Sequence, residues 1–330
     1  MGVAAVIVSD ATDAELVERA LVSVLYQTYP VDEIVVVEAK RRITNDLEEM
    51  IHGADSRIVL EHYHCYNASM ARNHGATLCH SEFICFLDGD DEWSPHMIED
   101  RMALVDDGIC MVTSKYACMT GKNGRLKRFM PVIPNGTELF GSNLIGSNSY
   151  VMMRRDLFLK LGGFDPKLVY HQDWDLWIRM LKHGRVAISP MLGGIRYYNP
   201  FSASKSKIVC REGWIGFARK WAHVYRHERE CTESIARLYA DDMSRFDGPK
   251  YMVRGPFGLI RRKFLNRLPS WMNLDFYRDR SDRDRVMSLE EVEHLRSISE
   301  KGTEDNTPKV VYLMHPLFKG KLIRPRRGHV

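Results

Sequence analysis

Short apolar runs alternate with amphipathic stretches through the first part of the chain. Residues 3–8, 33–38 and 82–87 are mostly β-branched or aromatic, the pattern of strands buried on both faces. Residues 16–25 and 70–78 repeat apolar positions at helical spacing. This order predicts an α/β fold with a mostly parallel central sheet flanked by helices.

The pattern continues less regularly after residue 90. It predicts strands at 57–60, 108–114 and 149–153, and helices at 44–52, 95–105, 156–161 and 173–183. Residues 115–145 mix Gly, Pro and Lys and predict no clear element. Beyond residue 207 the chain becomes helical in pattern, so we expect a helical C-terminal extension.

Composition narrows the class of protein. Of the 330 residues, 45% are hydrophobic and 27% charged, which disfavours a disordered, collagen-like or coiled-coil chain. The net charge of +4 does not favour a nucleic-acid partner. Seven cysteines without a C-x-x-C pair oppose a disulfide framework or a structural zinc site and favour a cytoplasmic protein. No apolar run is long enough to span a bilayer, and the first residues resemble a strand more than a signal peptide.

An acidic cluster follows directly after the apolar run at 82–87. Asp88, Asp90, Asp91 and Glu92 place four carboxylates within five residues, and Gly89 permits a sharp turn between the first two. Ligands of parallel sheets bind beyond the carboxyl ends of strands, and Mg²⁺ or Mn²⁺ combines carboxylate with phosphate ligands. A solvated acidic loop that caps the next helix is the alternative.

Four segments in register resemble one family. Residues 68–75 (Ala-Ser-Met-Ala-Arg-Asn-His-Gly) with 83–91 strongly resemble the nucleotide-sugar half of family 2 glycosyltransferases with the GT-A fold. Residues 20–37 are similar to that family's opening. Gly162-Gly-Phe-Asp165 and residues 173–179 are similar to its acceptor-side motif, so the resemblance covers about residues 3–200.

The resemblance implies sugar transfer from a nucleoside-diphosphate sugar to a hydroxyl acceptor, with inversion. It implies a GT-A catalytic domain over residues 1–207, with a nucleotide-binding half at 1–92 and an acceptor half at 93–207, followed by a mainly helical, basic region at 208–330. Asp88-Gly89-Asp90 would be the metal-binding DXD motif. Asp90 would bind Mn²⁺ or Mg²⁺ directly and Asp88 would lie near the ribose or the metal, whereas Asp91 is a less expected ligand.

The resemblance also assigns the general base to Asp173, at the start of the 173–183 helix. The alternative is an acidic residue that only stabilises the helix N-terminus. The family usually has Glu before this Asp, whereas this chain has Gln172. We expect Asp175 to be structural or to face the acceptor, and Trp174 and Trp177 to belong to the core.

Donor-binding positions come from the same comparison. The base and ribose would be read at the ends of the first two strands, the diphosphate would meet an arginine, and a flexible loop would close on the phosphates. The positions are Ser9, Asp10, Glu38, Arg72, Arg196 and Ser204. A carboxylate such as Glu38 accepts a hydrogen bond from a pyrimidine imide, so a UDP-sugar is the favoured donor. The family's Asp-Asp-Gly-Ser pattern is here Glu38-Ala-Lys-Arg41, which leaves uracil specificity open.

The acceptor would be a glycan, saccharide or lipid-linked sugar, and no motif sets the donor sugar, the linkage or the oligomeric state. Residues 257–271 mix basic and apolar residues, which favours packing on the catalytic domain or, alternatively, peripheral contact with the inner face of an anionic membrane. Two other functions stay open. A sugar-phosphate nucleotidyltransferase would want a Gly-rich basic loop after the first strand, where this chain has Val8-Ser-Asp-Ala-Thr12. A non-catalytic nucleotide-sugar-binding subunit would explain Glu38-Ala39 and Gln172.

Overall fold

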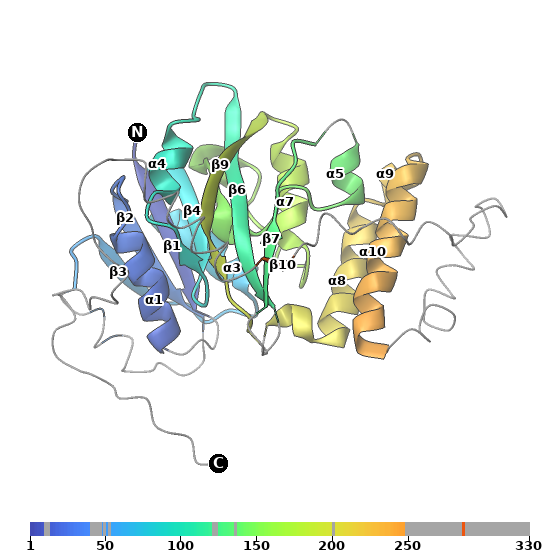
Figure 1. The fold of residues 1–330 in the computed structure, drawn as a ribbon, viewed down its shortest axis with the longest axis horizontal. Helices are drawn as coiled ribbons and strands as arrows, with labels where there is room; N and C mark the ends of the chain where they lie inside the picture. Colours follow the sequence, from blue (N-terminus) through green and yellow to red (C-terminus); the bar gives the residue numbers. More distant parts are fainter. Residues whose placement is uncertain are drawn as a thin grey trace, which may run out of the picture.

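A computed structural model gives the fold. It describes residues 1–9, 14–39, 48, 51, 54–120, 125–134, 137–199, 202–247 and 286–287. A single curved sheet runs through the molecule in the order β10-β7-β6-β8-β4-β1-β2-β3, and helices lie against it (Figure 1). β5 and β9 complete this sheet beside β6.

The first half of the chain forms the parallel part of the sheet. Its strands are β1 (Val3–Ser9), β2 (Glu33–Glu38), β3 (Ile58–His62) and β4 (Phe83–Asp88), with β1 paired in parallel to both β2 and β4. The helices α1 (Ala14–Leu25) and α3 (Ala68–Leu78) connect them. Because these strands are parallel, their carboxyl ends lie at one edge of the sheet.

Both faces of this sheet are buried, as the sequence predicts. Along β1, Val3, Ala5 and Ile7 belong to the core that includes α1, whereas Ala4, Val6 and Val8 belong to the core on the opposite face. Alternate side chains of a strand point to opposite faces, so an unbroken apolar run fits a strand covered by helices on both sides. The expected sheet flanked by helices is confirmed.

The second half adds mostly antiparallel strands beside β4. Its elements are β5 (Glu92–Trp93), α4 (Met97–Met102), β6 (Ile109–Thr120), β7 (Arg125–Phe129), α5 (Glu138–Gly141), η1 (Asn148–Tyr150), β8 (Val151–Arg154), α6 (Arg155–Lys160), α7 (Gln172–Met180) and β9 (Arg185–Arg196). The sequence pattern did not predict β7 or β9. The long strand β9 contains Pro190, Gly193 and Gly194, and its pairing with β6 shifts register near Ser114 and Lys115, which hides a period of two.

The C-terminal part packs beside α7. It comprises η2 (Ala203–Lys205), α8 (Lys207–Lys220), α9 (Ala222–Tyr225) and α10 (Arg229–Asp247), and residues of these helices share one core cluster with α7 (Figure 1). The short strand β10 (Val286–Met287) pairs with the edge strand β7. The 257–271 segment and most of the expected 44–52 helix lie outside the described residues.

Two further expectations concern the chain as a whole. All seven cysteines are free thiols, in agreement with the absence of a disulfide framework. Within the residues that the structure describes, no helix combines the length and the apolar character that crossing a bilayer requires.

Candidate active site

Three parallel strands deliver polar residues to the same edge of the sheet. Ser9 ends β1, Glu38 ends β2 beside it in register, and Asp88 ends β4 opposite Val8. Ser9 and Glu38 are buried, and His62 Nδ1 at the end of β3 lies 2.9 Å from Glu38 Oε2. Asp10, the other position expected here, lies outside the described residues.

The acidic cluster after β4 folds into one compact group. The backbone N–H of Gly89 donates to the carbonyl of Val8 at 2.9 Å and so extends the pairing with β1, and the N–H of Asp91 then donates to the carbonyl of Asp88 at 2.9 Å, which closes a turn. Asp88, Asp90 and Asp91 can each offer one carboxylate oxygen such that all three atoms lie within 4.8 Å of one another. The local turn therefore brings the two expected metal ligands, Asp88 and Asp90, together.

The three acids differ in their protein partners. Asp91 is buried and accepts from the Ser149 hydroxyl at 2.7 Å and from the backbone N–H of Tyr197 at 3.2 Å. Asp90 accepts from the Asn199 amide at 2.6 Å. Since both oxygens of Asp91 are engaged by protein donors, it is the least suited of the three to hold a cation.

Mutual repulsion is the main electrostatic feature of this cluster. Burial, and then the charges of Asp88 and Asp90, raise the pKa of Asp91 well above its ordinary value. Burial and the charge of Asp88 likewise raise the pKa of Asp90. Close carboxylates disfavour one another's ionised form unless a positive charge joins them.

Arg72 supplies one such charge. Its side chain is buried on α3 and donates through Nη2 to Asp88 Oδ1, and Asn148 also donates to that oxygen at 3.2 Å. Burial acts to raise the pKa of Asp88, but the guanidinium of Arg72 outweighs it and lowers the pKa. The buried Nε and Nη1 of Arg72 have no hydrogen-bond partner in the described part of the chain.

The acidic cluster and Arg72 can be compared with the ligands that a divalent cation and a diphosphate require. Carboxylate oxygens that converge within 4.8 Å are ligands that Mg²⁺ and Mn²⁺ prefer. Buried donors without partners are rare in proteins, so Nε and Nη1 of Arg72 fit a site that receives an anion. The residues present therefore fit both groups.

Asp173 lies at the start of α7, within electrostatic range of Asp88. Its carboxylate is half-buried and accepts from the backbone N–H of Trp174 at 2.7 Å. Burial raises the pKa of Asp173, while that N–H and the charges of Arg196 and Arg72 offset part of the rise, and the charge of Asp88 adds to it. Tyr116, on β6, also interacts electrostatically with Asp173.

The remaining two predicted residues lie at and after the end of β9. Arg196 ends β9, and its positive charge lowers the pKa of Asp88, Asp90, Asp91 and Asp173, so it faces both parts of the site. Ser204 instead lies in η2, where its hydroxyl contacts that of Ser202 at 3.0 Å. The structure thus brings Arg196 to the acids and does not bring Ser204 into contact with them.

Sequence reasoning missed two residues that hold the acidic cluster, Arg19 and Asn199. Arg19 on α1 donates to the backbone carbonyl of Asp90 at 2.6 Å and stacks on the ring of Tyr197, 3.8 Å from its centroid. Asn199 binds the Asp90 carboxylate, as described above. Their partners lie 71 and 109 residues away in the chain, and no local pattern indicates such contacts.

Several residues of the 162–165 and 173–179 segments have structural roles. Gly163 has φ of 67°, and an added Cβ there would lie 2.3 Å from Asn73 Oδ1, so only glycine fits. Asp175 is fully buried and accepts from Arg179, Lys220 and Trp221 at 2.9–3.1 Å. Trp174 and Trp177 are core residues, in agreement with expectation.

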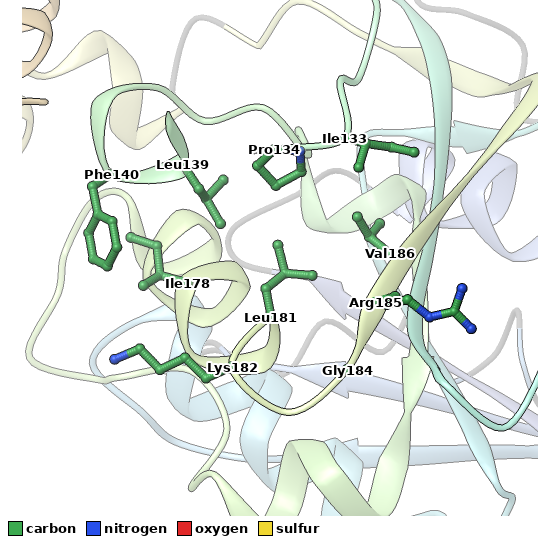
Figure 2. A pocket seen from close by; sticks show the side chains of 10 residues that line it. All are labelled: Ile133, Pro134, Leu139, Phe140, Ile178, Leu181, Lys182, Gly184, Arg185 and Val186. Carbon is green, nitrogen blue, oxygen red and sulfur yellow. The ribbon is translucent and has the colours of Figure 1, made fainter. Parts of the chain in front are cut away.

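A separate hollow of about 440 Å³ lies near the opposite end of α7 (Figure 2). Its lining is mostly apolar: Ile133, Pro134, Leu139, Phe140, Ile178, Leu181, Lys182, Gly184, Arg185 and Val186. None of these residues belongs to the acidic cluster. The acidic cluster and Arg72 therefore lie outside this hollow, at the edge of the sheet where the parallel strands end.

Known proteins resemble this chain in sequence. The amylovoran biosynthesis glycosyltransferase AmsB of Erwinia amylovora is 27% identical over 175 residues, which cover 48% of this chain and 57% of AmsB. WfgD of Escherichia coli, named a UDP-Glc:alpha-D-GlcNAc-diphosphoundecaprenol beta-1,3-glucosyltransferase, is 25% identical over 173 residues, which cover 52% of this chain and 66% of WfgD. The chain thus spans less than two thirds of the length of either relative.

Solved structures share the fold at low sequence identity. Residues 1–349 of S. aureus TarS, in complex with UDP-GlcNAc, superpose with a TM-score of 0.50 at 13% identity, covering 78% of this chain and 76% of that one. The mannosyltransferase PcManGT from Pyrobaculum calidifontis, in complex with GDP-Man and Mn²⁺, gives a TM-score of 0.53 at 14% identity, covering 81% of each chain. At this identity the likeness concerns the architecture, which is that of GT-A glycosyltransferases.

The family model described as "Glycosyl transferase family 2" matches residues 6–162, which contain the end of β1, the strands β2 to β4, Arg72 and the acidic cluster. Residues 6–162 of the chain are thus similar to glycosyltransferase family 2.

Proposed function

We propose that this protein transfers a sugar from a nucleoside-diphosphate sugar to a hydroxyl of a glycan or lipid-linked acceptor, with inversion and with a divalent cation. The observation that carries the proposal is the placement of Asp173 within electrostatic range of Asp88 and Arg72. A site for the diphosphate and a carboxylate for the attacking hydroxyl thereby share one region.

On the donor side, Asp90 and Asp88 would hold Mn²⁺ or Mg²⁺. The bound cation would supply Lewis-acid stabilisation of the departing diphosphate. Arg72 would bind phosphate oxygens through its unpartnered Nε and Nη1, and Arg196 would add positive charge from β9. Glu38 would accept from a ring N–H of the base, such as N3–H of uracil or N1–H of guanine, and a UDP-sugar remains the favoured donor.

On the acceptor side, Asp173 would take the proton. The acceptor oxygen forms a bond to the anomeric carbon while the bond from that carbon to the diphosphate oxygen breaks, and the electron pair leaves with the diphosphate. The hydroxyl proton moves to the carboxylate of Asp173. Attack on the face opposite the leaving group inverts the anomeric centre, and positioned bases of this kind contribute about 10²–10⁴-fold.

Acceptor class follows from the relatives, whose names point to polysaccharide and lipid-linked glycan synthesis. Transfer into a bacterial polysaccharide, onto a saccharide or a diphosphate-linked lipid, is the activity we propose to seek first.

The test is transfer from a panel of UDP- and GDP-sugars with Mn²⁺ or Mg²⁺ and then with chelator, and the product anomer is read by NMR. We expect Asp173→Asn to abolish transfer while nucleoside-diphosphate binding persists. Asp156→Asn is the matched control, because exposed Asp156 also accepts from the next backbone N–H at 2.7 Å but lies by the far end of β4. Transfer that persists in Asp173→Asn would remove the base assignment.

The same panel separates the two alternatives. A nucleotidyltransferase would form a nucleotide sugar from a nucleoside triphosphate and a sugar 1-phosphate. A non-catalytic subunit would bind the donor and transfer nothing with any acceptor.

A further inference from the structure

His171 has an unusual backbone conformation two residues before Asp173. Its φ of 64° lies in the left-handed region, and it is the one non-glycine residue with positive φ in the described ranges. Non-glycine residues held in this conformation are strained, and they persist where the surroundings enforce it. We therefore looked for contacts that enforce this backbone conformation and for its effect on Asp173.

The cause is an aromatic enclosure around the imidazole. The ring centroid of His171 lies 4.0 Å from that of Tyr170 and 5.5 Å from that of Trp174, both from its own segment. From α8, Trp214 and Phe217 approach to 4.1 Å and 5.6 Å. Four aromatic rings thus hold the imidazole from two elements.

Close packing of α8 makes this enclosure possible. A Cβ added to Gly213 would lie 2.3 Å from the Cβ of Tyr170, so α8 can approach the segment only with glycine at this position. The Nε2 atom of His171 is buried and has no hydrogen-bond partner among the described residues. Burial, with Arg245 adding to it, lowers the pKa of His171 to about 3, so the ring is neutral and serves as a packing element.

The backbone of His171 sets the start of α7. Its carbonyl accepts from the N–H of Asp175 at 3.0 Å, the first hydrogen bond of the helix, and Asp173 lies in that first turn. A right-handed conformation at His171 would redirect the chain into α7. The carboxylate of Asp173 would move with it.

We propose that His171 is a positioning residue, whose left-handed backbone and ring enclosed by Trp214 and Phe217 fix the Asp173 carboxylate relative to the donor site. This inference rests on the proposed role of Asp173. On this proposal α8 also helps to position the Asp173 carboxylate, although α8 follows the last long strand of the sheet in sequence.

The experiment compares His171→Ala, His171→Asn and His171→Gly. All three remove the ring, but Asn and Gly adopt the left-handed conformation more readily than Ala. We expect kcat to fall about 10–100-fold in the Ala variant, the scale of a misplaced catalytic group, and to recover partly in the Asn and Gly variants. Binding of UDP with Mn²⁺, measured by calorimetry, should stay within about twofold, because the donor residues lie on other elements.

A second variant tests the enclosure without altering the segment itself. Trp214→Leu removes a wall on α8, and we expect it to lower kcat and to move the acid limb of the kcat pH profile while UDP binding is retained. Tyr225→Leu on α9 is the matched control, because Tyr225 belongs to the same core cluster and its hydroxyl donates to the backbone carbonyl of Phe140.

Two results would overturn the proposal. One is a folded Ala variant with wild-type kcat. The other is an equal loss of kcat, UDP affinity and melting temperature in the Ala and Asn variants, since that pattern indicates a purely structural role. Asp173→Asn distinguishes the two levels of inference: if it transfers sugar normally, the base assignment fails whatever His171 does.

Discussion

The guanidinium of Arg72 and the carboxylate of Asp88 form a hydrogen-bonded ion pair between α3 and the end of β4. Arg72 is almost fully buried, so its charge is compensated mainly by this one acid. Two of its nitrogen atoms remain without a partner in the described part of the chain. The pair therefore links α3 to the end of β4 and leaves two buried N–H donors of Arg72 for the diphosphate proposed above.

Replacing Arg72 tests that arrangement. We expect Arg72→Lys to weaken UDP binding in Mn²⁺ by about 10–100-fold, because a lysine cannot reproduce a forked set of charged hydrogen bonds worth about 1.5–3 kcal/mol. Isothermal titration measures this directly. Arg211→Lys, an exposed arginine on α8, is the control, and equal affinity in both variants would contradict the role of Arg72.

Removing a carboxylate from the acidic cluster tests the cation site. Mn²⁺ at about 100 times its dissociation constant should stabilise the wild type by about 2.7 kcal/mol, and thus raise its melting temperature by about 4–5 °C for a chain of this size. Asp90→Asn should lose this rise. Without cation, the same variant should be at least as stable as the wild type, since repulsion from Asp88 is relieved.

Two comparisons complete that experiment. Asp156→Asn should keep the full response to Mn²⁺, because it lies away from the cluster. A wild-type protein whose melting temperature is the same in Mn²⁺ and in chelator would count against a cation at Asp88 and Asp90.

The pH dependence of transfer should report Asp173. A base must be ionised, and burial raises the pKa of Asp173 above its ordinary value of 3.8, so kcat should fall on acidification through a pH above that value. Arg196→Gln removes a charge that favours the ionised form. The acid limb should therefore move to higher pH in this variant, measured at saturating donor.

Arg211→Gln provides the reference for that shift. An acid limb that moves to lower pH in Arg196→Gln, or moves equally in both variants, would show that Arg196 does not act on the base.

The buried charge of Asp175 makes a prediction about stability. Asp175→Ala leaves Arg179 without its acidic partner and Lys220 with Asp165 alone, and breaking a buried ion pair in this way typically costs about 3–5 kcal/mol. Urea denaturation should show this loss. Glu212→Gln, which breaks an exposed pair with Arg211, should change stability by less than about 1 kcal/mol, and a similar small loss for Asp175→Ala would contradict the network.

Local patterns predicted the nucleotide half of the fold well. The strands β1, β2 and β4 are uninterrupted apolar runs, and the acidic cluster is contiguous in sequence, so both could be located without knowledge of packing. The roles assigned to Asp90 and Asp173 came from the family resemblance and remain proposals.

The parts of the fold and site that the sequence pattern did not predict depend on contacts between residues far apart in the chain. β9 is interrupted by Pro190 and two glycines, yet it delivers Arg196 to the acids. Asn199 reaches Asp90 only because the chain after β9 returns across the end of β4. The left-handed backbone of His171 depends on α8, which lies more than 30 residues further along the chain.

Lys220 contacts both Asp165 and Asp175, and so ties α8 to the two acceptor-side motifs at once. If the C-terminal helices were exchanged with those of a related protein, a graft without a cation at position 220 would remove the ion pairs that Asp165 and Asp175 both make with Lys220. Any attempt to alter the proposed acceptor specificity should therefore exchange α7 and α8 together.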